Sequence, residues 1–294
     1  MELKGTYTAL VTPFKSNGNV DYKALEKLIH LQMDSKVQGI VLFGTTGESP
    51  TLDAYEKFKI LQFVEKLNCG KLDIIIGISS NNTEKAISEI KGMSGTSAKA
   101  FLVGTPAYNK PTETGLLKHF KKIADESYKP IILYNVPSRT GTNIPLSVIS
   151  KLRNHPNIIG IKEASGNFDY ITKLTALSLP TFNVLSGNDN QTLPMMALGA
   201  TGVISVVSNI VPHELNLMVR YIQKGNTFAA RVVHELLLPL MNACFTETNP
   251  GPIKFMLSKL GLAKNKLRLP LAPLTQKSQK QVAKIMKEYF NLGE

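Results

Sequence analysis

Short apolar runs alternate along the chain with longer amphipathic segments. Each run is four to seven residues long, which is typical of strands that are buried in a parallel sheet. The eight runs are 7–11, 39–43, 72–78, 100–103, 131–134, 158–161, 182–185 and 202–207. The pattern therefore predicts eight strands separated by helices.

The segments between the runs place their apolar residues on one helical face. One such face consists of Leu116, Leu117, Phe120, Ile123 and Ala124, and another of Leu25, Leu28, Ile29 and Met33. Asp21 precedes the second of these segments and is expected to be its N-cap. The spacing thus predicts amphipathic helices that pack one face on the sheet.

Eight strands with crossover helices in about 225 residues match a (β/α)8 TIM barrel in number and length. An open doubly wound sheet is the alternative, but residues 11–14 form no Gly-rich dinucleotide turn after the first strand. Beyond residue 225 the strand pattern stops. A helical pattern at 227–244, a Pro-Gly breaker at 249–252 and two further helical segments follow. We expect a barrel that carries the active site over 1–225 and a C-terminal helical extension over 226–294.

Composition places the chain among ordinary globular proteins. It has 294 residues, of which 43% are hydrophobic, so most of the length is expected to be ordered. We expect neither a secretory signal nor a membrane span. The two cysteines, Cys69 and Cys244, lie far apart and form no CxxC pair. A disulfide scaffold and a zinc ribbon are therefore not expected. We expect the protein to function in a reducing cytoplasm.

The chain is basic, with a formal net charge of +12 and a pI near 9.5. Its lysines are spread along the length, and no zinc spacing, aromatic interleaving or recognition helix accompanies them. We therefore expect no nucleic-acid partner. A mild attraction for anionic small substrates is the more useful interpretation of the charge.

Lys162 ends the apolar run at 158–161, where a solvated lysine has little reason to stand. Burial at a strand end disfavours the ammonium form, and a neutral amine is what a Schiff-base nucleophile requires. The alternative is a lysine that leaves the strand and extends to water. Taken alone, this strand leaves both interpretations open.

Other polar residues follow the predicted strands, and the carboxyl ends of barrel strands share one face. Tyr134 ends the strand before that of Lys162, so a phenol able to transfer protons is expected beside the amine. The turn at Thr45 and Thr46 offers N–H groups and hydroxyls to a carboxylate. Arg139 follows Tyr134 and is suited to bidentate capture of a second carboxylate.

Each of these residues also has an ordinary structural interpretation. Tyr134 could be a core tyrosine, Arg139 a solvated loop residue, and the threonine turn a simple strand-to-helix connection with Ser49 or Thr51 as N-cap. Glu163 should point to the opposite side of its strand and be structural. The five histidines show no metal-ligand spacing, so no metal site is expected.

Four motifs together resemble one family. They are GTTGES at 44–49, YNVPSRTG at 134–141, IIGIKEAS at 158–165 and SGND at 186–189. They are similar, in order and spacing, to motifs of the 4-hydroxy-tetrahydrodipicolinate synthases, formerly called dihydrodipicolinate synthases. These enzymes are lyases of the pyruvate-dependent class I aldolase superfamily. The resemblance covers nearly the whole chain, from about residue 5 to the C-terminal helices.

The resemblance implies a catalytic group and a substrate. Lys162 would form a Schiff base with pyruvate, without a cofactor. Tyr134 would donate and accept protons through a relay with Thr45 and Tyr108. In such enzymes Tyr108 comes from the other subunit of a tight dimer, and the usual assembly is a homotetramer built as a dimer of dimers.

The resemblance also implies how substrates are held. Thr46 would bind the carboxylate of pyruvate, and Gly187 and Ile204 would line its pocket. Arg139 would bind the carboxylate of L-aspartate 4-semialdehyde. The product would be 4-hydroxy-tetrahydrodipicolinate, in the diaminopimelate and lysine biosynthesis pathway. An N-acetylneuraminate or keto-sugar-acid lyase of the same superfamily is the alternative, although these enzymes look different around Arg139 and tend to carry serine at Thr45.

The chain departs from the family pattern at two places. Ala107 stands where a second tyrosine is common before Tyr108. Lys57 and Lys85 occupy positions where lysine-regulated members have histidine and glutamate. Because two cations would repel a cationic effector, we expect weak or absent feedback inhibition by lysine.

Overall fold

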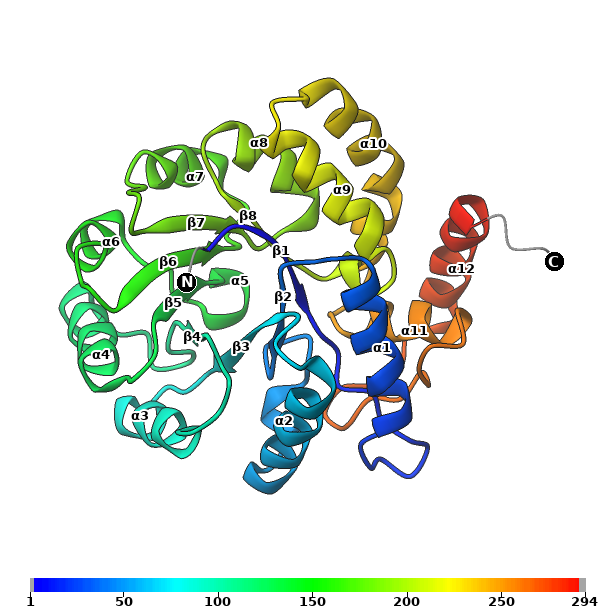
Figure 1. Cartoon of the computed structure of the whole chain (residues 1–294), viewed down its shortest axis with the longest axis horizontal. Helices are drawn as coiled ribbons and strands as arrows, with labels where there is room; N and C mark the ends of the chain where they lie inside the picture. The colour runs from blue at the N-terminus through cyan, green and yellow to red at the C-terminus, as the bar shows by residue number, and fades with distance from the viewer. Residues whose placement is uncertain (1–2, 291–294) are drawn as a thin grey trace.

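Eight parallel strands close into a barrel with helices around it, as the alternation predicts (Figure 1). The computed structural model describes residues 3–290. The strands pair in sequence order, and β8 closes on β1. Their bounds are β1 Gly5–Ala9, β2 Gly39–Leu42, β3 Asp73–Ile78, β4 Ala100–Gly104, β5 Ile131–Asn135, β6 Ile158–Glu163, β7 Asn183–Ser186 and β8 Gly202–Ser205.

Helices connect the strands and pack outside them. They are α1 Tyr22–Asp34, α2 Ala54–Asn68, α3 Thr83–Gly92, α4 Glu113–Glu126, α5 Pro137–Thr140, α6 Leu146–Leu152, α7 Phe168–Thr175, α8 Thr192–Ala197 and α9 Pro212–Gln223. Asp21 caps α1, as expected, by accepting from the N–H of Ala24. The cap of α2 is neither Ser49 nor Thr51. A short 3-10 turn occupies Ser49–Thr51, and Asp53 forms a capping box with Glu56.

The first and last strands end two residues earlier than the apolar pattern suggests. The side chain of Asn209 is the physical reason at β1. It donates to the carbonyl of Ala9 at 2.9 Å and accepts from the N–H of Val11 at 3.1 Å, so a side chain replaces the ladder there. At the other end, Val207–Asn209 turn into a 3-10 helix instead of continuing β8.

The apolar core has two parts, one between the strands and the surrounding helices and one inside the barrel. The inner part is formed by Leu3, Tyr7, Ala9, Val41, Ile75, Ala100, Leu102, Ile132, Tyr134, Val136, Leu185 and Ile204. These side chains fill the barrel, so the space for ligands lies at its end and not along its axis.

Three helices follow the barrel: α10 Thr227–Ala243, α11 Gly251–Lys259 and α12 Gln276–Phe290. They confirm the helical patterns expected after residue 225. α10 packs on α9, and α12 contacts both α10 and α11. The division into domains at residue 225 stays a prediction.

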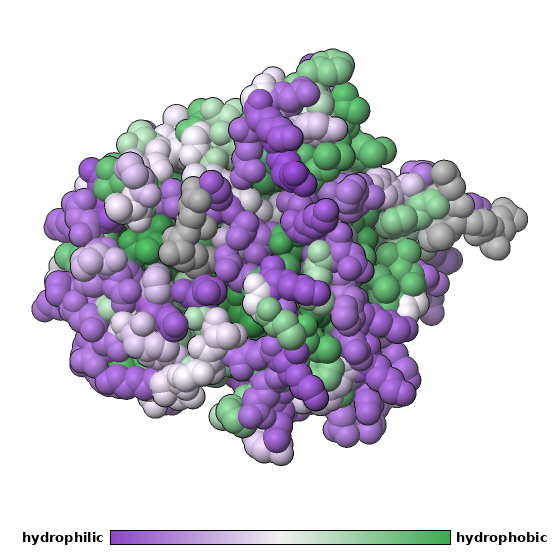
Figure 2. Space-filling view, viewed as in Figure 1, coloured by the Kyte–Doolittle hydropathy of each residue, from purple (hydrophilic) through white to green (hydrophobic). Residues whose placement is uncertain are grey.

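The surface seen in Figure 2 is mostly hydrophilic, with apolar side chains gathered over α10 at the top of the view. Three exposed apolar residues of α10 follow helical spacing, namely Phe228, Val232 and Leu236. Among the described residues, no helix combines the length and apolar character that crossing a bilayer demands.

Candidate active site

A cavity of about 320 Å³ opens at the carboxyl ends of the strands. It is lined by Ala9, Val41, Gly44, Thr45, Thr46, Leu102, Tyr134, Val136, Ser138, Arg139, Lys162, Ala164, Gly187, Asn188, Val206, Phe245, Glu247, Thr248 and Asn249. Six of the eight residues predicted for the site lie in this lining: Lys162, Tyr134, Thr45, Thr46, Arg139 and Gly187. The structure thus brings together residues that are up to 142 positions apart in the sequence.

Lys162 and Tyr134 lie side by side at the bottom of this cavity. The two residues are partners in the parallel register between β5 and β6. The amine Nζ lies 4.5 Å from the centre of the Tyr134 ring, and Lys162 is only 6% exposed. The lysine therefore stays in the site instead of extending to water, which was the alternative for this strand end.

Gly187 gives Lys162 the room that it occupies. A Cβ atom at Gly187 would lie 2.7 Å from Cβ of Ala164, 2.9 Å from the carbonyl oxygen of Glu163 and 3.1 Å from Cε of Lys162. Any larger residue after β7 would push against the strand and against the lysine side chain itself. The absence of a side chain at this position is therefore a geometric requirement of the site.

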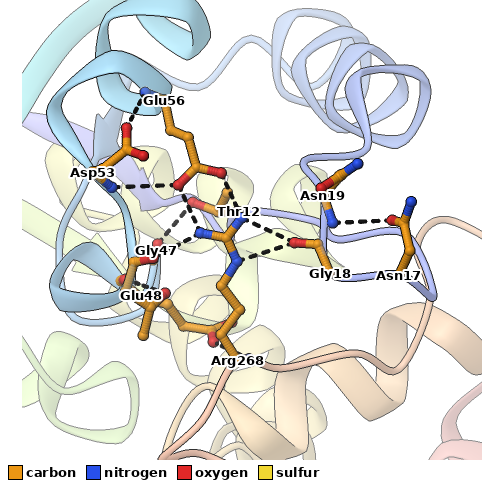
Figure 3. A network of polar contacts seen from close by, with 10 residues as sticks. Thr12, Asn17, Gly18, Asn19, Gly47, Glu48, Asp53, Glu56 and Arg268 are labelled. Atoms are coloured by element: carbon orange, nitrogen blue, oxygen red, sulfur yellow. Dashed lines mark hydrogen bonds and ion pairs between the residues drawn. The ribbon is translucent and has the colours of Figure 1, made fainter.

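The turn at Thr45 and Thr46 is held by its neighbours on both sides. The N–H groups of Gly47 and Glu48 donate to the carbonyls of Gly44 and Thr45, both at 3.1 Å. The hydroxyl of Thr12, from the chain after β1, donates to the carbonyl of Gly47 at 2.7 Å (Figure 3). This fixed turn presents Thr46, which is buried, to the cavity.

Arg139 stands on the short helix α5, directly after β5. Its Nη2 donates to the carbonyl oxygen of Asn249 at 3.1 Å. Asn249 in turn donates from Nδ2 to Oγ1 of Thr46 at 2.9 Å. One residue of the C-terminal extension therefore connects the arginine to the threonine turn.

The residues at 245–249 were missed by the sequence analysis, which placed the whole site on the barrel. Phe245, Glu247, Thr248 and Asn249 form one wall of the cavity. The only local signal was the Asn-Pro-Gly-Pro breaker between two helical segments, and it indicated a turn without indicating where the turn packs.

Two buried carboxyl groups lie near Lys162: Glu163, the next residue on β6, and Asp189, which follows β7. Glu163 does not line the cavity, and it accepts from Nδ2 of Asn135 at 2.7 Å and from the N–H of Ser165 at 2.5 Å. Burial raises the pKa of Glu163 although these hydrogen bonds oppose it. Asp189, after β7, accepts from the N–H groups of Val206 and Val207. Burial raises the pKa of Asp189, and the charge of Lys162 is among the influences that lower it.

Two predicted residues lie outside the lining. Ile204 is fully buried in the inner core of the barrel, below the cavity. Tyr108 follows β4 in a left-handed backbone conformation with φ of 74° and is 90% exposed. Within the single chain, Tyr108 is therefore not part of the lining of either cavity, and its expected role would depend on a partner subunit.

A second cavity, of about 630 Å³, adjoins the first. Thr45, Tyr134, Val136, Arg139 and Asn249 line both. The second cavity also has Lys85 and Ala107 in its wall, two of the positions at which the sequence departs from the family pattern. Lys57, the third position, is paired with Glu89 at 2.6 Å.

The residues that the structure describes contain no group of three or more His, Cys, Asp and Glu side chains that could hold a metal ion. The groups that line the cavity include the amine of Lys162, the phenol of Tyr134, the hydroxyls of Thr45 and Thr46 and the guanidinium of Arg139.

Known proteins resemble this chain over nearly its full length. A model of the dihydrodipicolinate synthetase family matches residues 2–289. A protein of Koribacter versatilis named 4-hydroxy-tetrahydrodipicolinate synthase is 42% identical, over 98% of this chain and 96% of its own.

Solved structures also resemble this chain over nearly its full length. Dihydrodipicolinate synthase of Thermotoga maritima gives a TM-score of 0.96 at 38% identity and covers 99% of this chain and 100% of its own. The chloride-inhibited dihydrodipicolinate synthase of Acinetobacter baumannii, solved with pyruvate, gives a TM-score of 0.95 at 35% identity. It covers 99% of this chain and 100% of its own. With its closed barrel, its four motifs and these matches, the chain belongs to the dihydrodipicolinate synthetase family.

Proposed function

We propose that this protein condenses pyruvate with L-aspartate 4-semialdehyde to give 4-hydroxy-tetrahydrodipicolinate, a step of diaminopimelate and lysine biosynthesis. The observation that carries the proposal is the buried pair of Lys162 and Tyr134 at the bottom of the cavity. An amine held beside a phenol, within reach of a carboxylate-binding turn, is suited to Schiff-base chemistry on a 2-oxo acid.

The reaction begins when the neutral amine of Lys162 attacks the ketone carbon of pyruvate. The resulting carbinolamine loses water to become an imine, and loss of a methyl proton converts this imine to an enamine. The enamine carbon then attacks the aldehyde carbon of the semialdehyde, whose oxygen takes up a proton. The amino group of the condensed product finally displaces Lys162, closes the ring and returns the free amine.

Each of these steps moves a proton, and Tyr134 is placed to be the group that does so. Its ring lies against the amine, and Thr45 lines the same cavity. Tyr108 of the partner subunit would complete the relay, which is consistent with its exposure in the single chain.

Two groups would hold the substrate carboxylates. The fixed turn at Thr46 would bind the carboxylate of pyruvate, with Gly187 beside the reacting carbon and Ile204 in the apolar layer below. Arg139, at the mouth, would bind the carboxylate of the semialdehyde. Its hydrogen bond to Asn249 leaves further guanidinium N–H groups for a bidentate contact.

The same proposal includes a homotetramer built as a dimer of dimers. Exposure of Tyr108 supports a contact that brings it to a partner's cavity, and the apolar residues of α10 support a further one. Sedimentation equilibrium at micromolar concentration tests this. A monomeric enzyme with full activity would contradict the shared relay.

Turnover of aspartate semialdehyde with pyruvate, measured beside cleavage of N-acetylneuraminate, tests the substrate. We expect the first reaction only, and the reverse result would assign the chain to the lyases of the superfamily. Borohydride reduction in the presence of pyruvate tests the mechanism. A pyruvyl adduct should appear on the peptide that contains Lys162 and should be lost in Lys162→Ala.

A further inference from the structure

A buried ion pair connects the GTTGES motif with the C-terminal extension. Lys254, on α11, donates from Nζ to Oε1 of Glu48, and the side chains of both residues are withdrawn from solvent. The amine also donates to the carbonyl of Lys266 at 3.0 Å and lies 4.1 Å from the centre of the Phe14 ring. The other oxygen of Glu48 accepts from the N–H of Arg268 at 3.0 Å.

The segment that supplies this N–H is itself fixed. Figure 3 shows the guanidinium of Arg268 between Glu56 and the carbonyl of Gly18. It bonds the two oxygens of Glu56 at 2.7 and 2.5 Å, and it also donates to the carbonyls of Gly18 and Thr51. Both oxygens of Glu48 are therefore held by groups of the C-terminal extension that lie 206 and 220 residues later in the chain.

Glu48 is an unusual place for such a contact. Its backbone is left-handed, with φ of 53°, which costs energy for a residue other than glycine. Burial lowers the pKa of Lys254 to about 8, although the carboxylate of Glu48 opposes this shift. In other proteins, replacing a buried ion pair by apolar residues is often neutral or stabilising, so the pair is weak evidence for a role in stability.

The same short segment of the extension contacts the turn at a second point. Asn249, five residues before Lys254, donates to Oγ1 of Thr46, and its carbonyl holds Arg139. The residues at 249–254 therefore hold the turn both at Thr46 and, two residues later, at Glu48. A shift of this segment would move the hydroxyls of Thr45 and Thr46 relative to Lys162.

We infer that Lys254 is a positioning residue for pyruvate: through Glu48 it holds the Thr45–Thr46 turn in the geometry that binds the substrate carboxylate. This inference rests on the proposed function, because it assigns the turn to pyruvate. It makes the C-terminal extension a functional part of the site. Neither Lys254 nor Glu48 touches substrate in this account.

Three variants and one control test the inference. Lys254→Met removes the amine but keeps an apolar chain of similar length, and it leaves Glu48 buried without its cation. Glu48→Gln turns one oxygen into an NH₂ group that must face either Lys254 or the N–H of Arg268. The double variant removes both charges and so leaves no unpaired ion. Lys91→Met, at an exposed ion pair with Glu126, is the matched control.

Each single variant is expected to lower kcat/KM for pyruvate by about 10- to 100-fold, the effect of displacing a binding group by about an ångström. The pyruvate concentration that half-saturates borohydride trapping should rise by a similar factor. The KM for the semialdehyde should change by less than about two-fold, because Arg139 is held by Asn249. Lys91→Met should match the wild type in all three measurements.

The double variant separates positioning from stability. Its melting temperature should return toward that of the wild type, since no buried ion is left unpaired, while its use of pyruvate should stay impaired. Recovery of both would show that the pair serves stability only and would overturn the inference. If Lys254→Met does not fold, the use of pyruvate can still be measured in the double variant, which leaves no unpaired buried ion.

Failure of the inference differs from failure of the proposed function. A wild-type protein that traps no pyruvate would contradict the function itself. A wild type that traps pyruvate normally, beside single variants that fold and trap it equally well, would contradict only the role of Lys254.

Discussion

Lys162 and Tyr134 are register partners on adjacent strands, and the amine lies 4.5 Å from the centre of the phenol ring. The ring therefore packs against the amine and helps to hold it in the cavity. The same ring carries the hydroxyl that is proposed to transfer protons. One side chain thus both packs against the proposed nucleophile and carries the proposed proton donor.

Replacing Tyr134 by phenylalanine separates these two roles. The ring contact with Lys162 stays, but the proton carrier is lost, so kcat should fall by about 10²- to 10⁴-fold. Steady-state rates with saturating substrates measure this. Tyr170→Phe is the matched control, because its hydroxyl donates to the carbonyl of Ile144 at 2.6 Å and does not line the cavity. Similar activity loss in both variants would contradict a catalytic role of the Tyr134 hydroxyl.

Alanine at Gly187 should inactivate the enzyme without unfolding it. The new Cβ would meet Ala164, Glu163 and Lys162 at 2.7 to 3.1 Å and displace the amine. We expect a loss of about 100-fold in pyruvate trapping and a destabilisation of about 1–3 kcal/mol, measured by denaturant unfolding. Gly92→Ala, where a Cβ meets nothing within 4 Å, should leave trapping unchanged. Normal trapping by Gly187→Ala would show that the strand and the lysine adapt.

Arg139→Ala should affect the second substrate and spare the first. Loss of a charge-assisted bidentate contact costs about 1.5–3 kcal/mol, so the KM for aspartate semialdehyde should rise by roughly 10- to 150-fold. Borohydride trapping of pyruvate should stay within about two-fold of the wild type. Arg139→Lys keeps the charge but not the fork, and an intermediate loss is expected. Equal loss of trapping and of semialdehyde use would argue against a role confined to the second substrate.

Buried His119 should make the fold sensitive to acid. Burial lowers the pKa of His119 to about 4 from its ordinary 6.5, so between these values the unfolded chain binds a proton that the folded chain does not. Stability present at neutral pH is therefore lost as the pH falls from about 6.5 to 4, by on the order of 3 kcal/mol. Denaturant titrations of the wild type and of His119→Gln over this range measure it.

The variant at His119 should lose less stability than the wild type as the pH falls. His30→Gln, at an exposed histidine, is the control and should follow the wild-type pH dependence. If the free energy of unfolding of the wild type and of His119→Gln fell in parallel with pH, His119 would not be the cause of the loss of stability in acid.

Feedback by lysine should be weak or absent. Lys85 lines the second cavity, whereas Lys57, on α2, is paired with Glu89 and is not part of that lining. A cationic effector in this cavity would meet the ammonium group of Lys85, which disfavours its binding. Initial rates with and without millimolar lysine, at constant ionic strength, measure the effect. Strong inhibition would contradict the expectation.

The barrel could be predicted because each strand is short, apolar and followed by an amphipathic helix. Local pattern also brought six of the eight predicted site residues to one cavity, since the fold brings all strand ends to one face. It could not find Asn249 or Lys254. Their partners, Thr46 and Glu48, are 203 and 206 residues away, and no local period records such a contact.

A lysine within Pro-Ile-Lys-Phe-Met reads as the polar side of a helix, yet Lys254 is buried among apolar neighbours. Its environment comes from Phe14 and from the segment at 266–268, neither of which is adjacent in the chain. Likewise, the exposure of Tyr108 follows from tertiary structure and could not be deduced from its motif.

The wall at 245–249 is supplied late in synthesis, because it follows all eight barrel strands in the sequence. During synthesis the barrel strands are complete once residue 205 has emerged, and Lys162 and Tyr134 can then already pair. Thr46 and Arg139 must wait for Asn249, and Glu48 for Lys254 and Arg268. A chain synthesised only as far as β8 therefore contains Lys162 and Tyr134 but lacks the residues that hold the turn and the arginine.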